Sequence, residues 1–212
     1  MINRDKVEIK VNNTKIDYQD EYIYLGQIIS MRNLHGKEIQ RRIANAWKRF
    51  WSLREILKNK KFNIKLKKKV FDSCVLPVLT YGCQSWGLTK NQYEKLALCQ
   101  RAMERSMLGI KRKDRKRNTD IRNMTGVADV SVRIRRLKWK WAGHTLRGKD
   151  KWSQRVITWY PRNGKRKRGR QNKRWSDDIT RIGGKLWTRS AKDRVLWKEL
   201  EEAYAEGHTD HN

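Results

Sequence analysis

The chain opens with an alternating apolar pattern. KVEIKV (6–11) places every second residue on one apolar face, and NNTK (12–15) supplies turn residues before the pattern returns at Ile16 and Tyr18. This arrangement predicts a β-hairpin. YIYLGQIIS (22–30) is a second short apolar run, and the glycine inside it predicts a strand that bends or lets another backbone come close.

From residue 37 the apolar spacing changes to steps of three and four, which is the helical period. A first helix is predicted where this spacing runs from Ile39 to Leu57. A second is predicted from about Asn63. Pro77 should kink it rather than end it, because apolar residues continue in register to Tyr81.

A third helix has a start signal of its own. Thr89 followed by Gln92 forms a capping box, in which side chains and backbone amides satisfy each other, and Gly109 is placed to end the helix. Three helices joined by short turns predict a small bundle.

The next segments are more basic. KRKDRKR (111–117) reads as a solvated linker, and a short helix is predicted over 118–126 with Gly126 as its stop. A longer helix follows over 129–147. Its apolar face is expected to comprise Val130, Ile134, Leu137 and Trp141, while Arg133, Arg136, Lys140 and Arg147 share another face.

The last part of the chain combines tryptophans with a dense basic run. Residues 165–174 hold seven Lys or Arg in ten positions, which cannot fold alone against their own repulsion. WSDDI (175–179) predicts a short helix, and a final helix is predicted to present Trp197, Leu200 and Tyr204 on one face.

These patterns predict a mainly α-helical fold: an N-terminal β-hairpin and short strands, a three-helix bundle, and a basic helical C-terminal region. We expect four parts: a β-rich part over 1–36, the bundle over 37–110, a basic linker and helix pair over 111–149, and a basic, Trp-containing region over 150–212.

Charge narrows the class of partner. The 212 residues include 52 Lys and Arg against 22 Asp and Glu, which leaves a formal net charge of +30. So many like charges destabilise a compact state unless a polyanion offsets them, and nucleic acid is the commonest one. An acidic membrane surface is the weaker alternative.

No apolar run approaches the roughly 20 residues that span a bilayer, and MINRDKVEIK (1–10) lacks the apolar core of a signal peptide. We therefore expect no membrane association and an intracellular location, nuclear or nucleocytoplasmic. Cys74, Cys83 and Cys99 fit neither a disulfide framework nor a zinc pattern. They are interpreted as reduced, buried thiols, and no metal site is predicted.

Basic segments supply the candidate binding residues, through phosphate contacts and, at an exposed Trp139, through stacking on a base or ribose. The alternative is a core helix with a basic solvent face, in which that tryptophan is buried. The predicted nucleic-acid-binding residues are Lys111, Arg112, Lys113, Arg115, Lys116, Arg117, Arg133, Arg136, Lys138, Trp139, Lys140, Arg147, Lys165, Arg166, Lys167, Arg168, Arg170, Lys173 and Arg174.

A second function class stays open. The helices predicted over 118–126 and 129–147, joined by TGVAD, imitate a helix-turn-helix, whose second helix lies in the major groove. A stand-alone, sequence-specific DNA-binding protein would use 118–147 in this way.

Asp177 and Asp178 are the one carboxylate pair that suggests two-metal chemistry. The competing interpretation places them in the first turn of a helix, where negative charge is favoured, and adjacent helical residues diverge by about 100°. We favour the second and predict no catalytic residue, since no phosphate-binding glycine loop, G-x-S-x-G motif or Cys–His pairing occurs in the chain.

Six segments in fixed order carry a resemblance that covers residues 6–204. They closely resemble the C-terminal part of the reverse transcriptase of non-LTR (LINE-type) retrotransposons. The segments are YIYLG, LPVLTYGCQSW, QRAMERSMLGI, RLKWKWAGHTLR, GRQNKRWSDDI and AKDRVLWKELEEAY. Gln84 stands where that family usually has Glu, and Gln171 where it usually has Pro.

The resemblance implies roles for these parts. Tyr24, Leu25 and Gly26 would match the end of the palm near the primer grip, residues 37–110 the thumb, and the basic remainder a region thought to help hold RNA template and target DNA. The parent polymerase uses palm aspartates with a divalent metal, Mg²⁺ by expectation, but no Tyr/Phe-x-Asp-Asp motif occurs here. This segment should therefore grip nucleic acid and hold no cofactor or small-molecule ligand.

Overall fold

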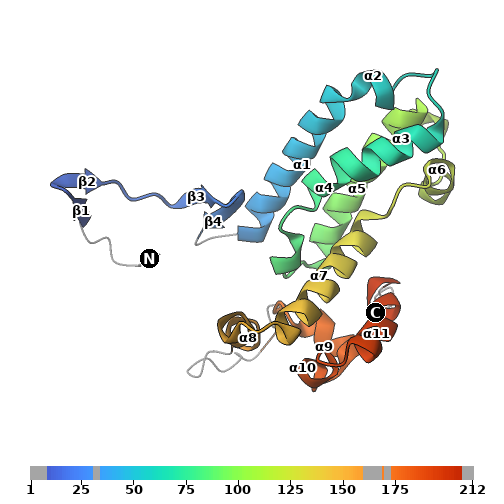
Figure 1. The fold of residues 1–212 in the computed structure, drawn as a ribbon. Coiled ribbons are helices and arrows are strands. Elements are labelled where there is room, and N and C mark those ends of the chain that lie inside the picture. The colour runs from blue at the N-terminus through green and yellow to red at the C-terminus, as the bar shows by residue number, and fades with distance from the viewer. Residues whose placement is uncertain (1–8, 31–33, 160–168, 170–172, 207–212) are drawn as a thin grey trace.

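The structure is a computed structural model, and it describes residues 9–30, 34–159, 169 and 173–206. The chain is mainly α-helical, with two short antiparallel strand pairs at its start (Figure 1). The predicted fold class is confirmed.

Two hairpins precede the helices. Strands β1 (Ile9–Val11) and β2 (Thr14–Ile16) pair across a two-residue turn, as the sequence predicts. β3 (Glu21–Tyr24) and β4 (Gln27–Ser30) pair across Leu25 and Gly26, both of which have positive φ. The prediction of a single bent strand over 22–30 is therefore wrong, because the glycine allows a tight turn instead.

The predicted bundle is present. Helix α1 (Leu34–Ser52) is followed by the short α2 (Arg54–Leu57), so the first predicted helix is broken near Leu53. The second predicted helix begins with α3 (Ile64–Val70), and the Asn63 side chain accepts a hydrogen bond from the Leu66 amide there. It continues through a π-helical turn (Phe71–Val75) into α4 (Leu76–Leu79).

The predicted kink at Pro77 thus takes the form of a π-helical turn directly before α4. Such a turn widens the helix by one residue and changes the direction of its side chains. Pro77 lies in the first turn of α4, directly after the π-helical turn, and its missing N–H cannot donate to the preceding turn.

Helix α5 (Lys90–Leu108) has the predicted capping box at Thr89 and Gln92, and it ends at Gly109 in the left-handed conformation. It completes the first hydrophobic core. Buried residues from α1, α4 and α5 meet there, including Phe50, Leu79 and Met103. Cys83 and Cys99 are buried free thiols, as expected, while Cys74 is half-buried.

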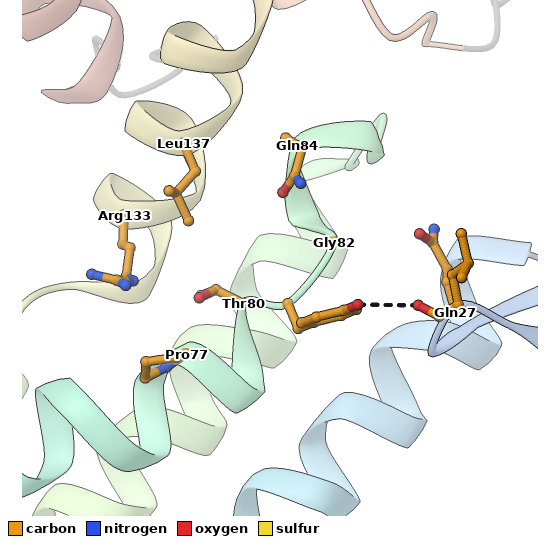
Figure 2. Close-up of a pocket in the computed structure, with 9 residues that line it drawn as sticks. Gln27, Pro77, Thr80, Gly82, Gln84, Arg133 and Leu137 are labelled. Atoms are coloured by element: carbon orange, nitrogen blue, oxygen red, sulfur yellow. Dashed lines mark hydrogen bonds between the residues drawn. The ribbon is translucent and has the colours of Figure 1, made fainter.

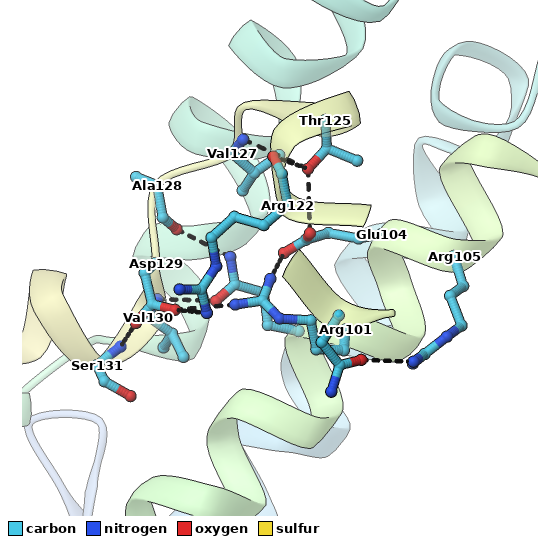
Figure 3. A network of polar contacts seen from close by, with 12 residues as sticks. Arg101, Glu104, Arg105, Arg122, Thr125, Val127, Ala128, Asp129, Val130 and Ser131 are labelled. Carbon is cyan, nitrogen blue, oxygen red and sulfur yellow. Dashed lines mark hydrogen bonds and ion pairs between the residues drawn. The ribbon is translucent and has the colours of Figure 1, made fainter. Parts of the chain in front are cut away.

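A turn joins α6 (Asn118–Thr125) to α7 (Val130–Arg147), and a polar network fastens it to α5 (Figure 3). The Gln100 amide donates to the Ala128 carbonyl (2.8 Å) and accepts the Val130 amide (2.7 Å). The buried Arg101 bridges Glu104 and Asp129. Gln100 and Arg101 of α5 thus bind the backbone of the turn and Asp129, and these contacts fix the position of the turn.

Beyond the bundle, α8 (Lys151–Thr158), α9 (Asp177–Gly183), α10 (Trp187–Ser190) and α11 (Arg194–Glu206) gather at the far end of α7 (Figure 1). A second core forms between them and α7. The rings of Trp139 and Trp197 stack at 3.7 Å within 6° of parallel, and each indole N–H donates to the other residue's carbonyl (2.8 and 3.0 Å).

The glycine of the KWKWAGH stretch makes this second core possible. A Cβ on Gly143 would lie 2.4 Å from Nε1 of Trp197, so only glycine lets α11 approach α7 this closely. Helix α7 therefore belongs to both cores: Val130 and Ile134 pack in the first, and Trp139 and Leu146 in the second.

Candidate nucleic-acid interface

The Tyr-Leu-Gly turn is fastened to the helical bundle by two arginines and a tyrosine. Arg41 and Arg42 both donate to the carbonyl of Gly26. The Tyr81 hydroxyl donates to the carbonyl of Leu25 (3.1 Å), and the Arg42 guanidinium lies over the Tyr81 ring at 4.5 Å. Two motifs 56 residues apart in the sequence are thus held together.

Glu38 organises these arginines. Its carboxylate accepts from Arg42 (2.6 Å), from Arg41 (3.0 Å) and from the backbone amide of Ile28 (2.9 Å). Burial by itself would raise the pKa of Glu38, but the hydrogen bonds from Arg41 and Ile28 and the charge of Arg42 lower it overall. The carboxylate is therefore ionised at neutral pH and ties β4 to α1.

A hollow of about 430 Å³ lies where this turn, the LTYGCQ segment and α7 meet (Figure 2). The predicted binding residue Arg133 lies on its wall, and its Nε is buried without a hydrogen-bond partner among the described residues. The lining comprises Leu25, Gln27, Pro77, Thr80, Tyr81, Gly82, Gln84, Arg133 and Leu137.

The other predicted cations of α7 are mostly engaged with the C-terminal helices. Arg136 pairs with Glu202 (2.6 Å) and Lys140 with Glu201 (3.3 Å). Arg147 donates to the carbonyl of Ala191 (2.6 Å). The charges of Arg136 and Lys140 are thus partly offset by carboxylates of α11.

Two predicted contacts on α7 do not reach the surface. Lys138 is 1% exposed and is held by the Asp178 carboxylate at 2.9 Å, and Trp139 is 0% exposed in the second core. The expectation of an exposed Trp139 is wrong, because its ring packs against Trp197. Trp141 was expected on the apolar face, yet it is 37% exposed, so the two tryptophans exchange places.

The basic linker agrees with expectation in its exposure. Its cations Lys111, Arg112, Lys113, Arg115, Lys116 and Arg117 are all exposed. In the C-terminal run, Lys173 is exposed and Arg174 is half-buried. Lys165, Arg166, Lys167, Arg168 and Arg170 lie outside the described residues.

Sequence reasoning missed a further basic segment. Residues 58–69 hold seven lysines in twelve positions, and the exposed ones are Lys58, Lys60, Lys61, Lys65 and Lys69. The lysine density of this segment predicts an exposed basic surface, whereas its helical spacing of apolar residues predicts only packing against the bundle.

One lysine of this segment is structural. The buried Lys67 amine donates to the carbonyl of Met107 (3.0 Å), where α5 ends and its dipole favours a cation. Burial lowers the pKa of Lys67. This contact holds α3 against the end of α5, a few residues before the basic linker.

The two exposed basic segments lie at the same end of the molecule. Helix α3 packs beside α6 (Figure 1). The Lys68 side chain lies close to Gly126. An exposed aromatic residue lies at this end as well. Trp51 is 46% exposed and stacks on Trp47 with ring centres 6.0 Å apart, and Lys58 lies 5.0 Å above its ring. We call residues 51–69 and 111–117 the basic end.

Asp177 and Asp178 occupy the first turn of α9, as favoured from the sequence. Asp178 binds Lys138, and Asp177 accepts the backbone amide of Arg174 (2.7 Å). Within the described residues no group of three or more His, Cys, Asp or Glu could hold a metal ion. In the same residues, no helix combines the length and apolarity needed to cross a membrane.

Comparison with known proteins places the chain. A transposon-derived protein of Caenorhabditis elegans is 35% identical over 203 residues, which cover 88% of this chain and 71% of that protein. The chain belongs to this family of transposon-derived proteins.

A second comparison gives a match over part of the chain. The chain is 29% identical over 98 residues to the RNA-directed DNA polymerase from transposon BS of Drosophila melanogaster, and this match covers 45% of the chain and 11% of that protein. No protein-family model matches the chain. No solved structure matches it either.

Proposed function

We propose that this chain is the nucleic-acid-gripping C-terminal part of a non-LTR retrotransposon reverse transcriptase: the end of the palm, the thumb and the basic C-terminal region. The order of its six motifs and its partial similarity to a transposon RNA-directed DNA polymerase support this assignment. It would hold RNA template and DNA primer or target while the parent polymerase joins nucleotides at divalent metals.

The basic end is the observation that carries the proposal. Its cations protrude from two segments that α3 and α6 bring together. A dense cluster of exposed cations neutralises phosphates without reading bases, which suits a grip that must slide along many sequences.

Trp51 takes over the stacking role expected of Trp139. An exposed indole next to lysines offers a base both a ring face and a neighbouring charge. The grip would therefore combine stacking at Trp51 with phosphate contacts from Lys58, Lys60 and the linker 111–117.

Salt dependence tests the proposal directly. Affinity of the full chain for duplex and single-stranded oligonucleotides should fall steeply with salt, with a log–log slope of about −0.9 per phosphate contacted on duplex DNA and about −0.7 on single strands. Retained affinity with a shallow slope, or no binding at low salt, would contradict it.

The alternative, a sequence-specific helix-turn-helix protein, makes a different prediction. It requires one preferred site, with about 1 to 3 kcal/mol lost per wrong base pair. Helix α7 contributes buried residues to both cores along its length, and the α6–α7 turn is bonded to α5. A grip that tolerates sequence agrees better with a helix so enclosed; selection from a random duplex library distinguishes the two.

A further inference from the structure

The hollow beside the Tyr-Leu-Gly turn has the composition of a ligand site. Its volume of about 430 Å³ falls in the range of small-molecule pockets. Leu25, Pro77 and Leu137 give it apolar walls, and none of its nine lining residues is acidic. Figure 2 shows that the lining comes from three parts of the chain: the β3–β4 hairpin, α4 with the segment after it, and α7.

Arg133 supplies a charge that the protein leaves unanswered. Its Nε is closed to solvent without a hydrogen-bond partner, and no carboxylate of the described residues pairs with the guanidinium, so an anion in the hollow is favoured by the uncompensated charge. The other α7 cations differ, because Arg136 and Lys140 already contact carboxylates.

The surrounding field is positive as well. Burial raises the pKa of the Cys83 thiol to about 12, while Arg133, Lys138 and Arg42 each act on it in the opposite direction. Cys83 lies between Gly82 and Gln84, which both line the hollow. Of these three cations, Lys138 is paired with Asp178 and Arg42 with Glu38, which leaves Arg133 as the cation on this wall that no carboxylate of the described residues offsets.

The Gln84 side chain is the polar group best placed for a base. Its backbone carbonyl is fixed by the Trp175 indole N–H (2.7 Å), while its amide makes no hydrogen bond to the described residues. An amide both donates and accepts, so it can pair with the edge of any base. Gln27, by contrast, is engaged with Ser85 (3.3 Å).

We propose that this hollow binds one nucleotide of a gripped strand, with its phosphate on Arg133 and its base between the apolar walls and the amide of Gln84. The inference deepens the proposed function and rests on it. On α7 it assigns nucleotide binding to Arg133 alone, whereas the sequence predicted several binding cations on this helix.

Nuclear magnetic resonance of the full chain tests the site without relying on the overall grip. Thymidine monophosphate should shift the Nε–H signal of Arg133 and the side-chain amide of Gln84, thymidine should shift neither strongly, and inorganic phosphate should shift Arg133 alone. An Arg133 signal that ignores thymidine monophosphate at saturating concentration would overturn the proposal.

Oligonucleotide affinity supplies the second arm, with variants of equal charge. Arg133→Gln should weaken binding of a fifteen-residue oligothymidine about tenfold, since a charged hydrogen bond is lost. Arg136→Gln, one turn further along α7, should weaken it less than about threefold. Equal losses would overturn the pocket and leave the grip standing, whereas a wild-type chain that binds no oligonucleotide would refute the proposed function instead.

A second variant protects the test against misfolding of Arg133→Gln. Gln84→Glu keeps the shape of the side chain and places a carboxylate in the hollow, so it should repel a phosphate and lower affinity about tenfold. Gln27→Glu is not an equivalent control because of its bond to Ser85, so Gln92→Glu at the α5 cap serves instead. Unchanged affinity in a folded Gln84→Glu protein would contradict the site.

Discussion

Helix α7 and the basic end are both rich in cations, yet the two regions use them differently. On α7, Arg136, Lys138 and Lys140 each contact a carboxylate of α9 or α11. At the basic end, the cations of 111–117 and most of those of 58–69 are exposed. Charge density along a sequence therefore does not distinguish two cases. In one, the cations of a helix pair with carboxylates of the same chain; in the other, exposed cations can bind a polyanion.

The aromatic residues repeat the contrast. Trp139 on α7 is enclosed by a second tryptophan, and Trp51 at the basic end is nearly half exposed beside Lys58. Each region therefore contains a tryptophan beside a lysine, but Trp139 and Lys138 are buried whereas Trp51 and Lys58 are exposed. Matched substitutions, one in each region, test this contrast.

The largest expected effect comes from the two tryptophans. Trp139→Ala should lower the free energy of unfolding by about 3 to 5 kcal/mol, because it opens a cavity and removes the hydrogen bond from the indole N–H to the Trp197 carbonyl. Trp51→Ala should cost little stability but weaken single-stranded binding by about 1 to 3 kcal/mol. Urea denaturation and fluorescence anisotropy measure the two. Reduced affinity in Trp139→Ala under conditions where it stays folded, with none in Trp51→Ala, would reverse the comparison.

The next largest loss of stability is expected at the buried ion pair between Lys138 and Asp178. Asp178→Ala leaves Lys138 buried without its carboxylate and should cost about 3 to 5 kcal/mol. Glu202→Ala breaks the surface pair with Arg136 and should cost at most about 1 kcal/mol. Thermal denaturation of both variants decides it; similar losses in the two would mean that Lys138 is not held as the structure describes.

Local sequence signals predicted the helices, and tertiary contacts decided the site. The capping box of Thr89 with Gln92 and the cap at Asn63 each involve residues only three positions apart, so the sequence alone predicts these helix starts. Trp139 and Trp141 stand about 200° apart on one helix, and the choice between them depends on Trp197, 58 residues beyond the first. No local pattern carries that information.

The same reason explains the candidate site. The density of positive charge predicted a polyanion-binding protein, and the linker 111–117 is exposed as expected. The isolation of Arg133 could not be predicted, because it depends on the absence of a carboxylate from a wall built by three separate segments. Lys138 shows the opposite outcome five residues later on α7, where α9 supplies Asp178.

An intermediate effect should separate the cations themselves. Lys60→Gln with Lys61→Gln removes two exposed charges from the basic end and should lower single-strand affinity about tenfold, with the salt slope reduced by about 1.4. Arg136→Gln with Lys140→Gln removes the same charge from α7 and should lower affinity less than about threefold. Titrations at several salt concentrations measure both slopes. Equal slopes in the two double variants would show that only net charge matters.

The smallest effect concerns the Tyr-Leu-Gly turn, whose arginines are engaged by Glu38. Because the folded-state pKa of Glu38 is lowered, its contribution to stability is present above the ordinary value of 4.5 and is lost as pH falls through the folded pKa, below 4.5. The Ile28 amide, which donates to this carboxylate, should therefore shift in nuclear magnetic resonance spectra only in that acidic window. Glu38→Gln should abolish the transition. A transition at Ile28 that persists in the variant, or one centred above pH 4.5, would mean that the turn is held mainly by Tyr81 and not by the carboxylate that unites the two arginines.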